Sequence, residues 1–127
     1  MATRRSWERL TRRPDFLRVA ATRRRCVTPG LILQAAERPL AGSAFRLGFT
    51  ASRKVGGAVL RNRARRRLKA AAGAVMAAHA APGMDYVLVA RAETVIRPYP
   101  GLLADLETAL KRLNMWRSGV ALGAERP

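Results

Sequence analysis

The pattern of apolar and polar positions in the first half of the chain predicts one helix followed by strands. A helix is expected to begin near Pro14, because proline suits the first helical position and Phe16 and Val19 then share one apolar face. Pro29 and Gly30 predict a turn before a buried strand centred on residues 31–33. Residues 45–50 alternate between apolar and polar or small side chains, which predicts a second strand with one face in the core.

The second half predicts a long helix, a strand and a final helix. The long helix is expected from about Ala58 to Ala80, where Pro82 and Gly83 follow. Residues 86–90 form a continuous apolar run typical of a central strand, and leucines at helical spacing predict a helix over 102–113. The order helix, strands, helix, strand, helix indicates one sheet with helices packed on it. The residues from 118 onward are expected to be frayed.

The long helix is expected to be cationic over most of its first three turns. A narrow apolar stripe would dock it: Leu60, Ala64, Leu68, Ala71 and Val75. The neighbouring stripe and the rest of the circumference are polar: Arg61, Arg65 and Lys69, then Asn62, Arg63, Arg66 and Arg67. Like charges spaced four residues apart repel one another, so this arrangement is understandable if phosphate groups supply the countercharge. A merely solubilising face is the alternative.

The charge of the whole chain supports a polyanionic partner. The 127 residues carry a formal net charge of +17, and the first 69 residues hold 19 basic and 3 acidic side chains. Such an excess of positive charge favours nucleic acid as a partner. A hydrophobic content of 49% argues against a disordered basic tail.

Three further features each allow a functional and an ordinary interpretation. The amide of Asn62 can hold a phosphate, a 2′-hydroxyl or a metal-bound water, or it can be an exposed residue without a role. Gly56 and Gly57 can cradle a phosphate at a helix start, or simply make a turn. Phe16 is a candidate for stacking on a base, whereas Phe45 and Phe49, at alternating strand positions, are expected in the core.

The sequence contains no pattern typical of a protein-borne catalytic site. The single His79 has no partner suited to acid–base work, and the single Cys26 is expected to be structural. One cysteine and one histidine cannot form a structural zinc site. No apolar run approaches the length of a membrane span, no secretory signal is evident, and a cytoplasmic location is expected. Any chemistry would therefore come from a partner.

Specific residues resemble a known family, the bacterial ribonuclease P protein component. The signature S-x-K-x-G-x-A-V-x-R-N-R-x-(K/R)-R is met at every fixed position between Ser52 and Arg66. Residues 9–19, R-L-T-R-R-P-D-F-L-R-V, resemble the opening of that family, and residues 85–91, D-Y-V-L-V-A-R, resemble its last strand. The resemblance covers about residues 9–115.

The resemblance implies an α+β fold for the chain. This is a single-domain αβββαβα sandwich, in which helices pack on one mostly antiparallel sheet with a left-handed βαβ crossover. Residues 1–127 would form a single RNA-binding domain with a folded core at about 9–115 and flexible ends.

The resemblance also implies a function and a set of binding residues. The protein would bind a catalytic RNA and the 5′ leader of precursor tRNA, and assist removal of that leader by Mg²⁺ ions held mainly by the RNA. The residues implied to bind the catalytic RNA are Arg53, Lys54, Arg61, Asn62, Arg63, Arg65, Arg66 and Lys69. Those implied to bind the leader are Phe16, Arg18 and Leu33. No protein side chain would be catalytic.

Two departures from the family pattern affect the leader site. Ala20 stands where relatives often carry a second aromatic residue, and Leu33 is aliphatic where they are often aromatic. Contacts from Arg18 and from the arginines at 23–25 to leader phosphates would then contribute a larger share of the leader-binding affinity.

Three other classes of binding protein compete with this interpretation. A small ribosomal protein would share the size and charge but not the signature. A DNA-binding helix–turn–helix protein is disfavoured because few base-reading side chains accompany the arginines. A membrane-surface helix is disfavoured because its apolar edge lacks bulky aromatic anchors. Neither DNA nor a membrane is therefore expected as a partner.

Overall fold

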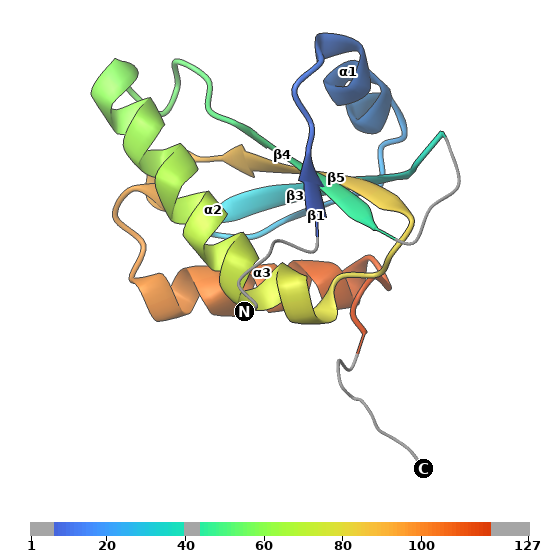
Figure 1. Ribbon diagram of the computed structural model, residues 1–127. Coiled ribbons are helices and arrows are strands. Elements are labelled where there is room, and N and C mark those ends of the chain that lie inside the picture. The colour runs from blue at the N-terminus through green and yellow to red at the C-terminus, as the bar shows by residue number, and fades with distance from the viewer. Residues whose placement is uncertain (1–6, 40–43, 118–127) are drawn as a thin grey trace, which may run out of the picture.

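The computed structural model describes residues 7–39 and 44–117, which form one five-stranded sheet with helices on both faces (Figure 1). The elements in chain order are β1 (Trp7–Arg9), α1 (Arg13–Ala21), β2 (Arg25–Val27), β3 (Leu31–Glu37), β4 (Phe45–Thr50), α2 (Ala58–His79), β5 (Met84–Ala90), the short 3-10 helix η1 (Ala92–Thr94) and α3 (Tyr99–Arg112). The expected αβββαβα order is confirmed, and the short β1 precedes it. The segment predicted to fray, from 118 onward, lies outside the described residues.

The sheet is mixed, with the strand order β1-β4-β5-β3-β2. β3 runs antiparallel to both of its neighbours, β5 and β2. These are two of the four strand pairings among the described residues, so the sheet is half antiparallel and not mostly antiparallel as predicted. β4 runs parallel to both of its neighbours, β1 and β5. Because β4 and β5 are adjacent, parallel and joined through α2, they form a βαβ unit. The left hand of this crossover stays a prediction.

The two faces of the sheet are covered unequally. α2 and α3 pack on one face and α1 lies on the other (Figure 1). The larger core lies under α2 and α3 and includes Leu31, Leu33, Leu47, Leu68, Met76, Leu88, Leu106 and Leu110. Under the nine-residue α1 a smaller cluster is buried, formed by Leu10, Val19, Ala36 and Val87. Part of the face that carries α1 is therefore accessible to a ligand.

The apolar stripe of α2 differs in part from the predicted one. Its buried residues are Ala64, Leu68, Ala71, Ala72 and Met76. Leu60, predicted to dock the helix, is 39% exposed, because the first turns of α2 extend beyond the sheet (Figure 1). The small alanines that follow allow α2 to approach α3 closely.

Candidate nucleic-acid interface

The turn that leads into α2 depends on a glycine. Gly56 has a φ of +141°, and a Cβ atom there would lie 2.5 Å from Cδ1 of Leu60, so other residues would be strained. The buried side chain of Val55 anchors the turn, while Arg53 and Lys54 just before it are exposed. This geometry supports the ordinary interpretation of Gly56, a turn that starts the helix.

All eight residues predicted to bind the catalytic RNA lie in the turn before α2 or within residues 58–69 of that helix. We call this set of residues the basic surface, and it consists of Arg53, Lys54, Arg61, Asn62, Arg63, Arg65, Arg66 and Lys69. Asn62, Arg63 and Arg66 are exposed, whereas Arg61, Arg65 and Lys69 are half-buried. Arg65 donates a hydrogen bond to Oδ1 of Asn62, so the amide orients one guanidinium of the surface. No acid among the described residues forms an ion pair with Arg63 or Arg66.

Arg67 does not belong to this surface, although the helical pattern placed it there. Its guanidinium is directed at the end of η1 and the residues that follow, and donates to the carbonyl oxygens of Thr94 at 3.1 Å, Val95 at 2.6 Å and Arg97. Three acceptors leave little of the guanidinium free for a phosphate. Arg67 therefore ties α2 to the segment between β5 and α3.

Phe16 lies over the open part of the sheet, on the face that carries α1. A Cβ atom on Gly48 of β4 would come within 2.5 Å of Cε1 and 2.7 Å of Cζ of the Phe16 ring, so the ring packs directly on the glycine backbone. Phe16 is half-buried, which leaves part of the ring accessible. Phe45 and Phe49 are buried in the core under α2 and α3, as predicted.

A row of side chains crosses this open part of the sheet. Thr50 of β4 pairs with Val89 of β5, Val89 pairs with Ile32 of β3, and Ile32 pairs with Val27 of β2. Directly opposed residues of neighbouring strands share one face, and Val89 packs against the cluster under α1. These four residues, called the open row below, are half-buried or exposed.

The predicted leader contact of Leu33 is wrong. Leu33 is completely buried in the core under α2 and α3, on the face opposite Phe16. Side chains alternate along a strand, so its neighbours Ile32 and Gln34 occupy the face that carries α1. Ile32 and Gln34, both half-buried, are therefore the residues of β3 that share a face with Phe16 next to Leu33.

Two hollows border the open row. One, of about 300 Å³, is lined by Thr11, Arg13, Phe16 and Thr50. The other, of about 440 Å³, is lined by Ile32, Ser52, Lys54, Val55, Val89, Ala90, Arg91 and Ala92. Both combine an apolar floor with cationic side chains at the rim, which suits an unpaired base with its phosphate. The sequence pattern did not indicate Arg91, which follows β5 directly and reaches the second hollow only through the fold of the chain there.

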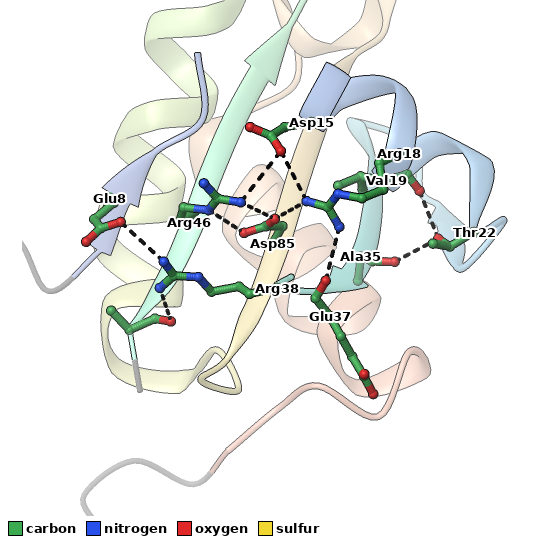
Figure 2. A network of polar contacts seen from close by, with 11 residues as sticks. Glu8, Asp15, Arg18, Val19, Thr22, Ala35, Glu37, Arg38, Arg46 and Asp85 are labelled. Atoms are coloured by element: carbon green, nitrogen blue, oxygen red, sulfur yellow. Dashed lines mark hydrogen bonds and ion pairs between the residues drawn. The ribbon is translucent and has the colours of Figure 1, made fainter. Parts of the chain in front are cut away.

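Arg18, the third residue predicted to touch the leader, takes part in a buried ion network (Figure 2). Asp85 of β5 is fully buried and accepts two hydrogen bonds of 2.7 Å from Arg46 of β4 and one from Arg18. Arg18 also donates to the carbonyl oxygen of Glu37 at 3.0 Å. The network fastens α1 to β3, β4 and β5, and so fixes the position of Phe16.

The network shifts the titration of its members. Burial alone would raise the pKa of Asp85, but hydrogen bonds from Arg46 and Arg18 outweigh that effect and hold the pKa below its usual value. The hydrogen bond to Asp85 in turn raises the pKa of Arg46. Asp85 is therefore ionised at neutral pH, as its two arginine partners require.

The residues considered as catalytic or metal-binding candidates lie away from this interface. His79 stacks on Trp116 with ring centroids 4.0 Å apart and is hydrogen-bonded through Nδ1 to the carbonyl of Arg117. Cys26 is buried against the core. Within residues 7–39 and 44–117, no three His, Cys, Asp or Glu side chains are grouped to hold a metal ion. No helix in the described part of the chain is long and apolar enough to span a membrane.

Structural comparison shows that known proteins share this fold. The ribonuclease P protein of Staphylococcus aureus matches with a TM-score of 0.72 at 23% sequence identity, over 86% of this chain and 97% of its own. The ribonuclease P protein of Thermotoga maritima matches with a TM-score of 0.63 at 24% identity, over 84% of this chain and 94% of its own.

Sequence comparison gives the family. A ribonuclease P protein component from Paramagnetospirillum magneticum is 56% identical over 110 residues, which cover 84% of this chain and 83% of the relative. One from Ruegeria pomeroyi is 48% identical over 108 residues, covering 83% and 85%. The profile of the family described as Ribonuclease P matches residues 5–114. Together with the signature met at every fixed position between Ser52 and Arg66, these matches show that the chain belongs to the bacterial ribonuclease P protein family.

Proposed function

We propose that this protein subunit of ribonuclease P binds the catalytic RNA through the basic surface of α2. The observation that carries this proposal is the exposure of Arg63 and Arg66 without an acidic partner among the described residues. Uncompensated guanidinium groups on one rigid helix present several donors to phosphate oxygens at once. The Arg65–Asn62 hydrogen bond orients a further guanidinium toward the same partner.

We also propose that the 5′ leader of precursor tRNA lies along the open row, against Phe16. The accessible ring of Phe16 can stack on a base, because every base offers a π-face. Thr50, Val89 and Ile32 give a flat floor that a single strand can cross. Lys54 and Arg91 at the rim supply charge to the backbone.

The division of labour leaves hydrolysis to the RNA partner. The Mg²⁺ ions would be held mainly by the catalytic RNA and would supply the attacking hydroxide and stabilise the leaving oxygen. The side chains of this protein would bind and orient the substrate. Such a complex would act in the cytoplasm, where precursor tRNA is processed.

Reconstitution with a ribonuclease P RNA tests the proposal. The double variant Arg63→Gln, Arg66→Gln should weaken binding to the catalytic RNA and raise the Mg²⁺ needed for cleavage of any precursor. The control is Arg112→Gln, an exposed arginine in the last turn of α3, which should change neither. Equal effects of the double variant and the control would reject the basic surface as the RNA interface.

The leader assignment is tested separately with Phe16→Ala. A stacked base contributes about 1–3 kcal/mol, so precursor affinity should fall about fivefold to a hundredfold. Binding to mature tRNA and to the catalytic RNA should not change. If precursor and mature tRNA lost affinity equally, Phe16 would be a structural residue and the leader would lie elsewhere.

A further inference from the structure

The open row continues beyond the two hollows to the outer edge of the sheet. From Thr50 on β4 it crosses β5 and β3 and ends at Val27 on β2, which is 44% exposed. Three strand spacings of ~4.8 Å make this path roughly 14 Å long, a span that a few extended nucleotides cover. Because α2 follows β4 in the chain, the basic surface adjoins one end of the path and β2 is the far end.

Arg25 is placed at this far end, on the same face. Its neighbour Cys26 is buried with Leu33 in the core under α2 and α3, so Arg25 points to the opposite face, that of the open row. Arg25 is exposed and pairs with Gln34, next to the Val27–Ile32 pair. Its side chain has no hydrogen bond or ion pair within the described part of the chain.

The adjacent Arg24 points the other way. Its carbonyl oxygen accepts a hydrogen bond of 3.0 Å from the amide of Ala35, which continues the strand pairing and its alternation by one residue. Its charge acts on the phenol of Tyr86, which belongs to the core under α2 and α3. Arg24 and Arg25 are thus equally charged, exposed and consecutive, yet lie on opposite faces of the sheet.

Among the described residues, the acids on the face of Arg25 are paired with other arginines, and the exposed Glu8 on β1, at the opposite edge of the sheet, pairs with Arg38. Asp85, the buried acid of that face, lies four residues before Val89 on β5. It is paired with Arg46 and Arg18. Asp15 is held by the same two arginines. An anionic strand leaving the open row would therefore meet an unneutralised guanidinium.

We propose that Arg25 holds a backbone phosphate of the leader where the strand leaves the sheet at β2. This inference rests on the proposed position of the leader along the open row. It adds a length threshold: only leaders that cross three strand spacings reach Arg25, and these bind more tightly than shorter ones.

The test uses the chain assembled with its catalytic RNA and precursor tRNAs whose leaders are lengthened one nucleotide at a time. The assembled wild type should show a late step in affinity as the leader reaches β2. Arg25→Gln should remove that step and lower affinity for long leaders about threefold to tenfold, the range of a single charged contact at a surface. Arg24→Gln should keep the step, and Arg25→Lys should restore part of it.

A second measurement changes the leader and compares its effect on the wild type and on Arg25→Gln. Replacing single leader phosphates by neutral methylphosphonates should reveal one distal position whose change weakens binding to wild type and has no effect with Arg25→Gln. Identical affinities of Arg24→Gln and Arg25→Gln at every leader length would overturn the inference, as would a loss of mature tRNA binding equal to the loss for precursor. If Phe16→Ala also left precursor binding unchanged, the proposed position of the leader itself would be wrong. If Phe16→Ala weakened precursor binding and Arg25→Gln did not, only the contact between Arg25 and the leader would be rejected.

Discussion

Asp85 is a buried carboxylate whose two arginine partners come from different elements. It has no exposed surface, whereas Arg46 and Arg18 keep 21% and 32% of their side-chain surface exposed. A buried charge of this kind is costly unless it is fully paired. Its structural value therefore lies in fastening α1 over the sheet, where Phe16 must face the open row.

Removing the charge of Asp85 should destabilise the fold and loosen α1. Asp85→Asn removes the negative charge and replaces one of the two acceptor oxygens by an NH2 donor that faces the guanidinium groups. The free energy of unfolding should fall by about 3 kcal/mol, the lower end for a broken buried pair, because water still reaches the arginines. Urea unfolding measures this loss. The control is Glu107→Gln, which breaks an exposed pair with Lys111 and should cost at most about 0.5 kcal/mol.

The same carboxylate predicts a pH dependence with a definite sign. The folded-state pKa of Asp85 lies below its unfolded value of about 3.9, so its stabilising contribution is complete above that value and is lost as pH falls through the folded pKa. The wild type should therefore lose stability steeply on acidification below about pH 4. Asp85→Asn should show a shallower loss in the same window, and parallel curves for the two proteins would contradict the assignment.

Gly48 controls the height of Phe16 above the sheet. In Gly48→Ala the new methyl group would overlap the Phe16 ring, so the ring must move away. Precursor affinity should fall as it does for Phe16→Ala, with a loss of about 1–3 kcal/mol in stability from overpacking. Gly57→Ala is the control, because nothing lies within 4 Å of a Cβ atom there. Unchanged precursor affinity in Gly48→Ala would show that the ring position does not matter.

At the scale of elements, α2 has two kinds of arginine that a helical pattern does not separate. Arg63 is exposed, whereas Arg67 is bound to carbonyl groups of a segment about thirty residues later in the chain. Arg67→Gln should lower the free energy of unfolding by about 1.5–3 kcal/mol, the range for hydrogen bonds to a charged donor. Its affinity for the catalytic RNA, measured below the unfolding temperature, should be retained. Arg63→Gln should show the reverse, and equal behaviour of the two variants would contradict the distinction.

The elements themselves were largely predictable from local sequence. A helix start near Pro14, where α1 begins at Arg13, and another after Gly57 follow from turn residues that the chain carries locally. Strands at residues 31–33, 45–50 and 86–90 follow from local periodicity. β1 was missed because Trp7–Arg9 is too short to show an alternation, and it forms only by pairing with the distant β4.

The candidate site was less predictable than the elements. Residues 31–33 are all apolar, so the sequence did not indicate which of them faces the core, and Leu33 was assigned to the wrong face. The neighbours Ile32 and Gln34 can be assigned only once the pairing of β3 with β5 is known. The same applies to Arg18 and Arg67, whose partners Asp85 and Thr94 lie far along the chain.

At the scale of the whole molecule, the positive charge is concentrated where RNA is proposed to bind. The first 69 residues, which include α1, β2, β4 and the basic surface, hold 19 of the 25 basic residues. α3 carries two acids among its 14 residues and packs on the opposite face from α1. The field of the molecule is therefore strongly asymmetric, which orients the approach of a polyanion.

This asymmetry predicts a steep salt dependence that can be assigned to surfaces. Each phosphate contact should contribute a slope of about 0.7–0.9 in a plot of log affinity against log salt concentration. Each guanidinium that binds a phosphate displaces condensed counterions. The Arg63→Gln, Arg66→Gln variant should therefore lower the slope for catalytic RNA by the contribution of about two contacts. The slope for the leader, obtained as the difference between precursor and mature tRNA, should be unchanged in that variant and reduced by about one contact in Arg25→Gln. A flat dependence for the wild type, or equal slopes for all variants, would show that phosphate contacts do not hold the complex together.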